Sequence, residues 1–204
     1  MKLMDYMEGS SMLKKYGIES IRSKYVNSKE EAIRFADGKS IVLKLISEKQ
    51  LHKANAGLVK VNLDTNANIE KAFDELKGKG KSLSPYKIIA QDSAKQGVEA
   101  IIGSRVDSQF GKLILFGLGG SYVEALKDVS IRLCPIDKYQ AGQMIEQLRS
   151  SALITHNGKA TERIESLLMQ ASKMIEKENI EELDLNPVII REDGYDIVDI
   201  RVLG

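Results

Sequence analysis

Apolar and polar residues alternate along the chain with two different periods, which predicts both helices and strands. Apolar residues recur at helical spacing in five segments, at about residues 5–16, 29–37, 69–77, 138–150 and 162–178. Short alternating or continuous apolar runs indicate extended structure at residues 18–26, 41–46, 58–63, 87–92, 98–106, 112–116, 131–136, 183–191 and 195–203. This mixture predicts an α+β protein.

Capping and turn residues mark where several of these elements begin and end. Ser28, followed three residues later by Glu31, forms a capping box before the second helix. Asp193 and Gly194 stand between the last two apolar runs and are a strong hairpin signal. Segments of turn length separate three central strands, which predicts a meander of residues 87–92, 98–106 and 112–116.

The composition limits the classes of partner that the chain can have. Its 30 Lys and Arg residues nearly balance 29 Asp and Glu residues, which argues against a nucleic acid partner. No run reaches the roughly 18 apolar residues that span a bilayer, so we expect no membrane anchor and no signal peptide. One cysteine and two histidines exclude an internal disulfide and the usual structural zinc sites. A reducing cytoplasm is the expected location.

Two basic side chains in the segment 41–57 are candidates for binding phosphate. Lys44 lies in the middle of an apolar strand, where a carboxylate or a bound phosphate must compensate its charge. The alternative is that Lys44 only snorkels from the edge of a sheet. His52 follows in a loop of small and basic residues that ends at Gly57 and permits backbone amides to approach a phosphate. His52 could also be an inert surface histidine.

The C-terminal hairpin brings three oxygen-bearing side chains to one face. If the Asp-Gly pair is the centre of the turn, Asp199 lies opposite Val188, and Asn186 is its diagonal neighbour at about 7–8 Å. Two such side chains can share one Mg²⁺ ion. Asp184 precedes Asn186 by two residues and therefore lies on the same face. A three-residue loop would move Asp199 to the other face, and the alternative to a metal site is a set of solvated polar residues.

A glycine-rich turn at residues 117–120 is a weaker candidate. Gly119 and Gly120, with Glu124 and Asp128 after them, could approach a chain of phosphates. Glycine turns are common, however, and the spacing of a complete dinucleotide or P-loop motif is absent.

Ordered motifs over nearly the whole chain resemble the ATP-grasp (beta) subunit of ADP-forming acetyl-CoA and other acyl-CoA synthetases, relatives of succinyl-CoA synthetase. The motifs are Tyr16-Gly17-Ile18, IVLKLIS, LHKANAGLV, IIAQDSAKQGVEAIIGSRVDSQFG, LFGLGGSYVEALKDVSIRLCPI, EELDLNPVII and VDIRV. The resemblance implies an ATP-grasp fold with an N-terminal lobe at 1–84 and a C-terminal lobe at 85–204 that ends in the metal-binding hairpin. It also implies that the nucleotide lies between the lobes, with ATP or ADP as substrate and Mg²⁺ as cofactor.

The resemblance assigns roles to individual residues. His52 matches the histidine that carries phosphate between an acyl-CoA site on a partner subunit and ADP, and Asp184 matches an acidic residue that steadies the phosphohistidine. Asn186 and Asp199 match the Mg²⁺ pair. The remaining matches are nucleotide-binding positions, namely Lys44 at the phosphates, Gln91 and Glu99 near adenine and ribose, Gly57 in the phosphate-side loop, and Gly119, Gly120 and Glu124 in the glycine motif.

The implied reaction is the reversible conversion of acyl-CoA, ADP and phosphate to the acid, CoA and ATP. The chain shows no dinucleotide-type CoA domain, so the resemblance implies an alpha-subunit partner with the CoA-binding and acyl-transfer domains, in a heterotetramer. Ala54-Asn55 and Gly57-Leu58 depart from the Ser-Asp and Gly-Gly pairs that are usual in the family. A noncatalytic nucleotide-binding regulatory subunit is therefore the alternative, and an ATP-dependent ligase for another carboxylate is a third reading.

Overall fold

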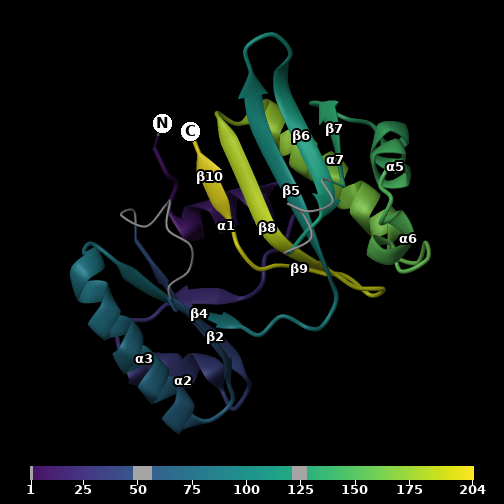
Figure 1. The fold of residues 1–204 in the computed structure, drawn as a ribbon. Coiled ribbons are helices and arrows are strands. Elements are labelled where there is room, and N and C mark those ends of the chain that lie inside the picture. Colours follow the sequence, from purple (N-terminus) through teal and green to yellow (C-terminus); the bar gives the residue numbers. More distant parts are fainter. Residues whose placement is uncertain (1, 48–56, 121–127) are drawn as a thin grey trace. The chain divides into compact units, whose positions relative to one another are not determined.

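The computed structural model describes residues 2–47, 57–120 and 128–204, and it divides into two compact units (Figure 1). The small unit is Ile21–Ser93, and the large unit is Met1–Ser20 together with Ala94–Gly204. Each unit combines a β-sheet with helices, which confirms the predicted α+β class. None of the helices in the described part of the chain is long and apolar enough to cross a membrane.

The small unit is an antiparallel four-stranded sheet with two helices on one face (Figure 1). The strands lie in the order β1 (Ser23–Tyr25), β4 (Lys87–Asp92), β2 (Ile41–Ile46) and β3 (Val59–Leu63). The covering helices are α2 (Lys29–Ala36) and α3 (Asn66–Gly80), and the 3₁₀ helix η2 (Lys81–Leu83) follows α3. Apolar side chains of both helices and of the inner strands form one buried core.

Side-chain caps decide where the two helices of the small unit begin. The Ser28 hydroxyl accepts a hydrogen bond from the Glu31 backbone N–H over 3.3 Å, which is one half of the predicted capping box, whereas Glu31 Oε2 accepts from the Asn27 N–H over 2.8 Å. Thr65 Oγ1 accepts one from the Asn68 N–H over 3.2 Å, so α3 begins three residues before the predicted start at residue 69. The cap, rather than the first apolar residue, sets the start of α3.

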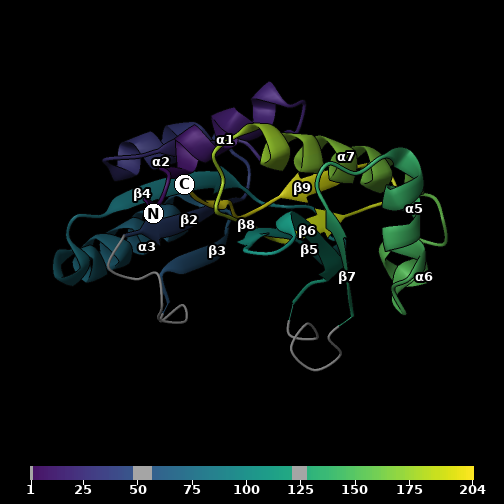
Figure 2. The same ribbon diagram turned by 90° about the horizontal axis from the view of Figure 1, so that it is seen from above.

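The large unit is built on a six-stranded antiparallel sheet. Along the sheet the order is β10 (Arg201–Leu203), β8 (Glu182–Ile190), β5 (Val98–Asp107), β6 (Gly111–Leu118) and β7 (Val129–Leu133), and β9 (Tyr195–Ile197) also pairs with β8. The helices are α1 (Tyr6–Lys15), α5 (Lys138–Glu146), α6 (Ser151–Ile154) and α7 (Thr161–Lys177). Figure 2 shows α7 lying along one face of this sheet.

Two long-range features of the fold differ from the division predicted at residues 84 and 85. The N-terminus joins the large unit because Lys2 N donates to Gly204 O over 2.7 Å and Met4 N donates to Val202 O over 2.9 Å. Strand β4 joins the small unit because it pairs with β2 from Ile41 to Ile46. For the same reason the predicted meander is wrong in its first strand, since β5 pairs with β6 and β8 rather than with β4.

Candidate functional site

Lys44 and Gln91 share one face of the small sheet. On β2 and β4 the core residues alternate with them, so both side chains lie on the face opposite α2 and α3. Lys44 is 8% exposed and pairs with Ile89, two residues before Gln91, which is 1% exposed. This diagonal relation separates the two residues by about 7–8 Å. Because β2 is an inner strand, Lys44 does not snorkel from a sheet edge.

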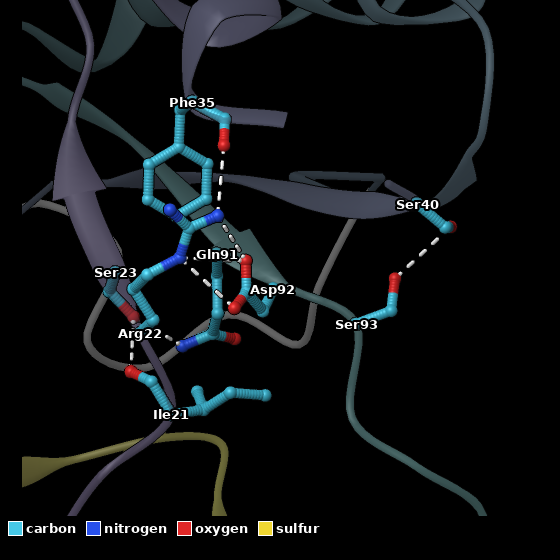
Figure 3. A network of polar contacts seen from close by, with 8 residues as sticks. All are labelled: Ile21, Arg22, Ser23, Phe35, Ser40, Gln91, Asp92 and Ser93. Atoms are coloured by element: carbon cyan, nitrogen blue, oxygen red, sulfur yellow. Dashed lines mark hydrogen bonds and ion pairs between the residues drawn. The ribbon is translucent and has the colours of Figure 1, made fainter. Parts of the chain in front are cut away.

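Hydrogen bonds fix the Gln91 side chain and the end of β4 (Figure 3). Gln91 Nε2 donates to Ser23 Oγ over 3.0 Å, and Ser23 Oγ donates to the Ile21 carbonyl over 2.9 Å. The next residue, Asp92, forms a two-pronged ion pair with Arg22, with distances of 3.0 Å from Nε to Oδ2 and 2.8 Å from Nη2 to Oδ1. The hydrogen bond with Asp92 raises the pKa of Arg22.

Gly57 is described by the structure, whereas the neighbouring candidate His52 lies outside the described residues. Gly57 is exposed and has a φ of 70°, a conformation that favours glycine. Its carbonyl accepts a hydrogen bond from Lys79 Nζ over 3.0 Å. This hydrogen bond therefore connects the end of the predicted phosphate loop to the last turn of α3.

The large unit brings the glycine motif against Glu99. Gly119 N donates to the Glu99 carbonyl over 2.7 Å, and a Cβ on Gly119 would lie 2.9 Å from Ala100 N. Gly120 has a φ of 70°, and a Cβ there would lie 2.5 Å from Glu99 Oε2. Three predicted nucleotide-binding residues therefore lie together. Close packing against the β5 backbone already requires glycine at 119, and the positive φ favours it at 120. Glu124, the fourth residue of this set, lies outside the described residues.

Asp128, the acidic residue after the glycine motif, stabilises a turn. Its Oδ1 accepts from Arg149 N over 2.9 Å, and its Oδ2 accepts from Ser150 N over 2.8 Å and from the Ser150 hydroxyl. Burial acts to raise the pKa of Asp128, but these hydrogen bonds outweigh burial and lower it. The Asp128 carboxylate therefore has a structural role, because both of its oxygens accept hydrogen bonds from this turn.

The C-terminal strands bring the predicted metal residues together in a register that differs from the predicted one. In every β8 pair with β9 or β10, including Val188 with Ile197 and Asp184 with Arg201, the two residue numbers add up to 385. Continued between β9 and β10, this register places Asp199 across from Asn186. The predicted pairing of Asp199 with Val188 is wrong by two residues, so the side chains keep the expected face.

The turn itself explains this shift. Arg191 N donates to the Gly194 carbonyl over 2.9 Å, so the centre of the turn is Glu192-Asp193 rather than Asp193-Gly194. The Arg191 side chain fixes this geometry with hydrogen bonds to Asp193 Oδ1 at 2.9 Å and Asp196 Oδ2 at 2.6 Å.

Asp184 combines a buried carboxylate oxygen with a raised pKa. Its Oδ1 is buried and has no hydrogen-bond partner among the described residues. Burial, and next the negative charge of Asp199, raise the pKa of Asp184, while Arg201 acts in the opposite direction. Carboxylate and amide oxygens are the ligands that Mg²⁺ prefers, and Mg²⁺ needs few protein ligands because it keeps several waters. The residues at this hairpin therefore fit a Mg²⁺ ion.

A groove of about 390 Å³ runs along the face of the large sheet that carries Asp184. Residues that alternate with the buried core of β5 and β6 line it, among them Ile101, Gly103, Leu113 and Leu115. Asp184, Glu182 and Arg105 supply charges to this lining. The groove is wide enough for part of a small-molecule ligand.

Comparison with known proteins decides the family. Residues 1–203 match the sequence profile of the ATP-grasp domain. The chain belongs to the ATP-grasp family. This result confirms the resemblance drawn from the motifs.

Two curated proteins and one solved structure to which this chain is similar are ADP-forming CoA ligases or an acetyl-coenzyme A synthetase. Acetate–CoA ligase [ADP-forming] II subunit beta of Pyrococcus furiosus is 32% identical over 96% of this chain and 89% of that protein. Acetate–CoA ligase [ADP-forming] I of Archaeoglobus fulgidus is 36% identical over 97% of this chain, which spans only 30% of that protein's length. A solved structure of Ca. Korarchaeum cryptofilum dinucleotide forming acetyl-coenzyme A synthetase 1 matches with a TM-score of 0.84 and 33% identity, over 99% of this chain and 92% of that one.

The sequence analysis missed two residues that contact candidate site residues. Arg201 pairs with Asp184 across β8 and β10, and the correct hairpin register would have found it. Ser23 lies 68 residues from Gln91, and only the pairing of β1 with β4 brings the two together.

Proposed function

We propose that this chain is the nucleotide-binding beta subunit of an ADP-forming acetyl-CoA or acyl-CoA synthetase. The observation that carries the proposal is the register of the C-terminal hairpin, which, continued between β9 and β10, places Asp199 across from Asn186, two residues from Asp184 with its buried Oδ1. The proposal also draws support from the Pyrococcus furiosus relative, a beta subunit of similar length.

The proposed roles of the chain's residues follow from charge and position. Lys44 binds nucleotide phosphates, and Gln91 and Glu99 bind the base and the ribose. Gly57, Gly119, Gly120 and Glu124 supply loops at the phosphates. Asn186 and Asp199 hold Mg²⁺, which when bound neutralises phosphate charge and orients the transferred group.

We propose that the imidazole of His52 carries the phosphate and transfers it to ADP. The bond between phosphorus and the imidazole nitrogen breaks as a β-phosphate oxygen of ADP bonds to phosphorus, and the leaving imidazole nitrogen takes up one proton. A neutral imidazole is a competent nucleophile near pH 7, which makes the step reversible. The family resemblance gives Asp184 the proposed role of steadying the phosphohistidine. The Korarchaeum structure contains coenzyme A and Mg-AMPPCP, and its phosphohistidine segment points towards the nucleotide binding site.

The complete reaction, acyl-CoA with ADP and phosphate to acid, CoA and ATP, requires a partner. By analogy with the Pyrococcus furiosus relative, which is named as a subunit beta, we propose an alpha-subunit partner that carries the CoA-binding and acyl-transfer domains, in a heterotetramer. The expected compartment is the cytoplasm.

The test is ATP formation from acetyl-CoA, ADP and phosphate by the chain purified with its natural partner. We expect activity with the partner and none without it, and Asp199→Asn is expected to lower the activity at least about 100-fold by weakening Mg²⁺ binding. An active chain without a partner would contradict the two-subunit assignment.

The second candidate is a noncatalytic nucleotide-binding regulatory subunit of such a complex. The departure at Ala54-Asn55 beside His52 favours it. This candidate predicts that Mg·ATP binds to the complex while His52→Ala leaves ATP formation unchanged.

A further inference from the structure

A serine on the neighbouring strand holds the side-chain amide of Gln91 in one orientation. Ser23 Oγ donates a hydrogen bond to the Ile21 carbonyl over 2.9 Å and accepts one from Gln91 Nε2 over 3.0 Å. A hydroxyl has a single proton, and that of Ser23 goes to Ile21. Ser23 can therefore only accept from Gln91, so the amide nitrogen faces Ser23 and the amide oxygen points away from it (Figure 3).

The surroundings prevent the amide from turning over. Gln91 is 1% exposed, and its backbone is paired directly with Ser23 in the β1–β4 ladder. The adjacent ion pair of Arg22 with Asp92 and the hydrogen bond from Arg22 Nη2 to the Phe35 carbonyl, at 2.9 Å, hold both strands at this point. A turned amide would bring its oxygen against Ser23 Oγ, whose proton is already committed, or would break the bond to Ile21.

We propose that Ser23 is a positioning residue that makes the nucleotide site selective for adenine over guanine. The inference rests on the proposed function, in which Gln91 lies near the base. An amide oxygen accepts but cannot donate. Adenine carries an amino donor at the position where guanine carries a carbonyl acceptor. The fixed oxygen of Gln91 can accept from the adenine amino group, whereas it meets the guanine carbonyl as a second acceptor.

The size of the effect follows from one hydrogen bond and one unpaired buried acceptor. Losing the bond and leaving the amide oxygen and the guanine carbonyl facing each other corresponds to about 10-fold to 100-fold in affinity. Without the Ser23 hydroxyl, Nε2 loses this acceptor, and the preference for the amide orientation that suits adenine weakens. The Ser23→Ala variant should therefore gain affinity for GDP and lose little for ADP.

The experiment is calorimetric titration of the full chain with Mg·ADP and with Mg·GDP. We expect the wild type to bind ADP at least about 10-fold more tightly than GDP, and Ser23→Ala to reduce this ratio to about threefold or less. Ser23→Thr keeps the hydroxyl and should keep the ratio. Ser40→Ala is the matched control, because Ser40 Oγ accepts from Ser93 Oγ at 3.2 Å in a separate pair of the same unit (Figure 3).

Two results would overturn the inference while leaving the proposed function intact: equal affinities of the wild type for ADP and GDP, or a Ser23→Ala ratio equal to that of the wild type and Ser40→Ala. A wild-type chain that binds neither nucleotide, with its partner present, would overturn the proposed function and this inference together.

Discussion

Lys112 on β6 caps the C-terminus of α7, the helix that covers one face of the large sheet. Its ammonium donates three hydrogen bonds to backbone carbonyls, to Ile175 O at 2.8 Å, Glu176 O at 3.1 Å and Glu178 O at 2.7 Å. These carbonyls belong to the last turn of the helix and to the residue after it, where no intrahelical donor remains. The positive charge also lies at the negative end of the helix dipole.

Lys112→Met removes the charge and the three donors but keeps most of the apolar stem. Hydrogen bonds to a charged group contribute about 1.5–3 kcal/mol, and a cation at a helix C-terminus adds about 0.3–1 kcal/mol. Water can hydrate part of the exposed helix end, so we expect the free energy of unfolding to fall by about 2–3 kcal/mol. For a chain of this size the midpoint of thermal unfolding should fall by about 4–12 °C.

The assay is urea unfolding followed by far-ultraviolet circular dichroism, because the chain has no tryptophan. Lys173→Met is the matched control, since Lys173 is exposed on the same helix and has no hydrogen bond or ion pair with any described residue. If Lys112→Met lies within about 0.5 kcal/mol of this control, the capping argument is refuted.

Two further predictions follow from the packing of the large unit and from the charge of Asp184. Gly119→Ala should destabilise the chain by about 1–3 kcal/mol, because its Cβ meets the β5 backbone. Gly78→Ala, in an open position on α3, should instead stabilise it by up to about 1 kcal/mol, and equal unfolding midpoints for the two variants would contradict this. The raised pKa of Asp184 means that the folded state binds this proton more tightly than the unfolded state, so its contribution to stability is present at low pH and is lost as pH rises through that pKa. In EDTA, Asp184→Asn should therefore be more stable than the wild type at pH 7 but not at pH 3, and a variant less stable at pH 7 would show that the buried carboxylate is not strained.

The sequence predicts local elements of this fold well because their signals are local. The strands at 41–46 and 87–92 have the bounds that the apolar runs predict. What the pattern does not contain is the partner of each strand, since residues 93–97 look like a turn but connect two separate units. The place of β5 between β6 and β8 depends on contacts between residues about 80 positions apart, which no local spacing encodes.

The candidate site shows the same division between local and long-range information. Alternation on β8 places Asp184 and Asn186 on one face without knowledge of the rest of the fold. The Asp-Gly signal then gives the wrong turn centre, because the Arg191 side chain binds Asp193 and Asp196 and so favours a different turn. The error is an even number of residues, so the continued register still places Asp199 across from Asn186. The roles of all the candidate residues stay predictions, and His52 and Glu124 also lie outside the described residues.

Phosphate transfer to His52 is the central claim, and intact mass measurement after incubation with Mg·ATP tests it most directly. The measurement is made at neutral pH on the wild type, His52→Ala and His156→Asn; His156 is the only other histidine, and asparagine tolerates its φ of 50°. We predict a gain of about 80 Da, one phosphate group, in the wild type and His156→Asn and none in His52→Ala. An unlabelled wild type that binds ATP with its partner present, or a labelled His52→Ala, would contradict the account.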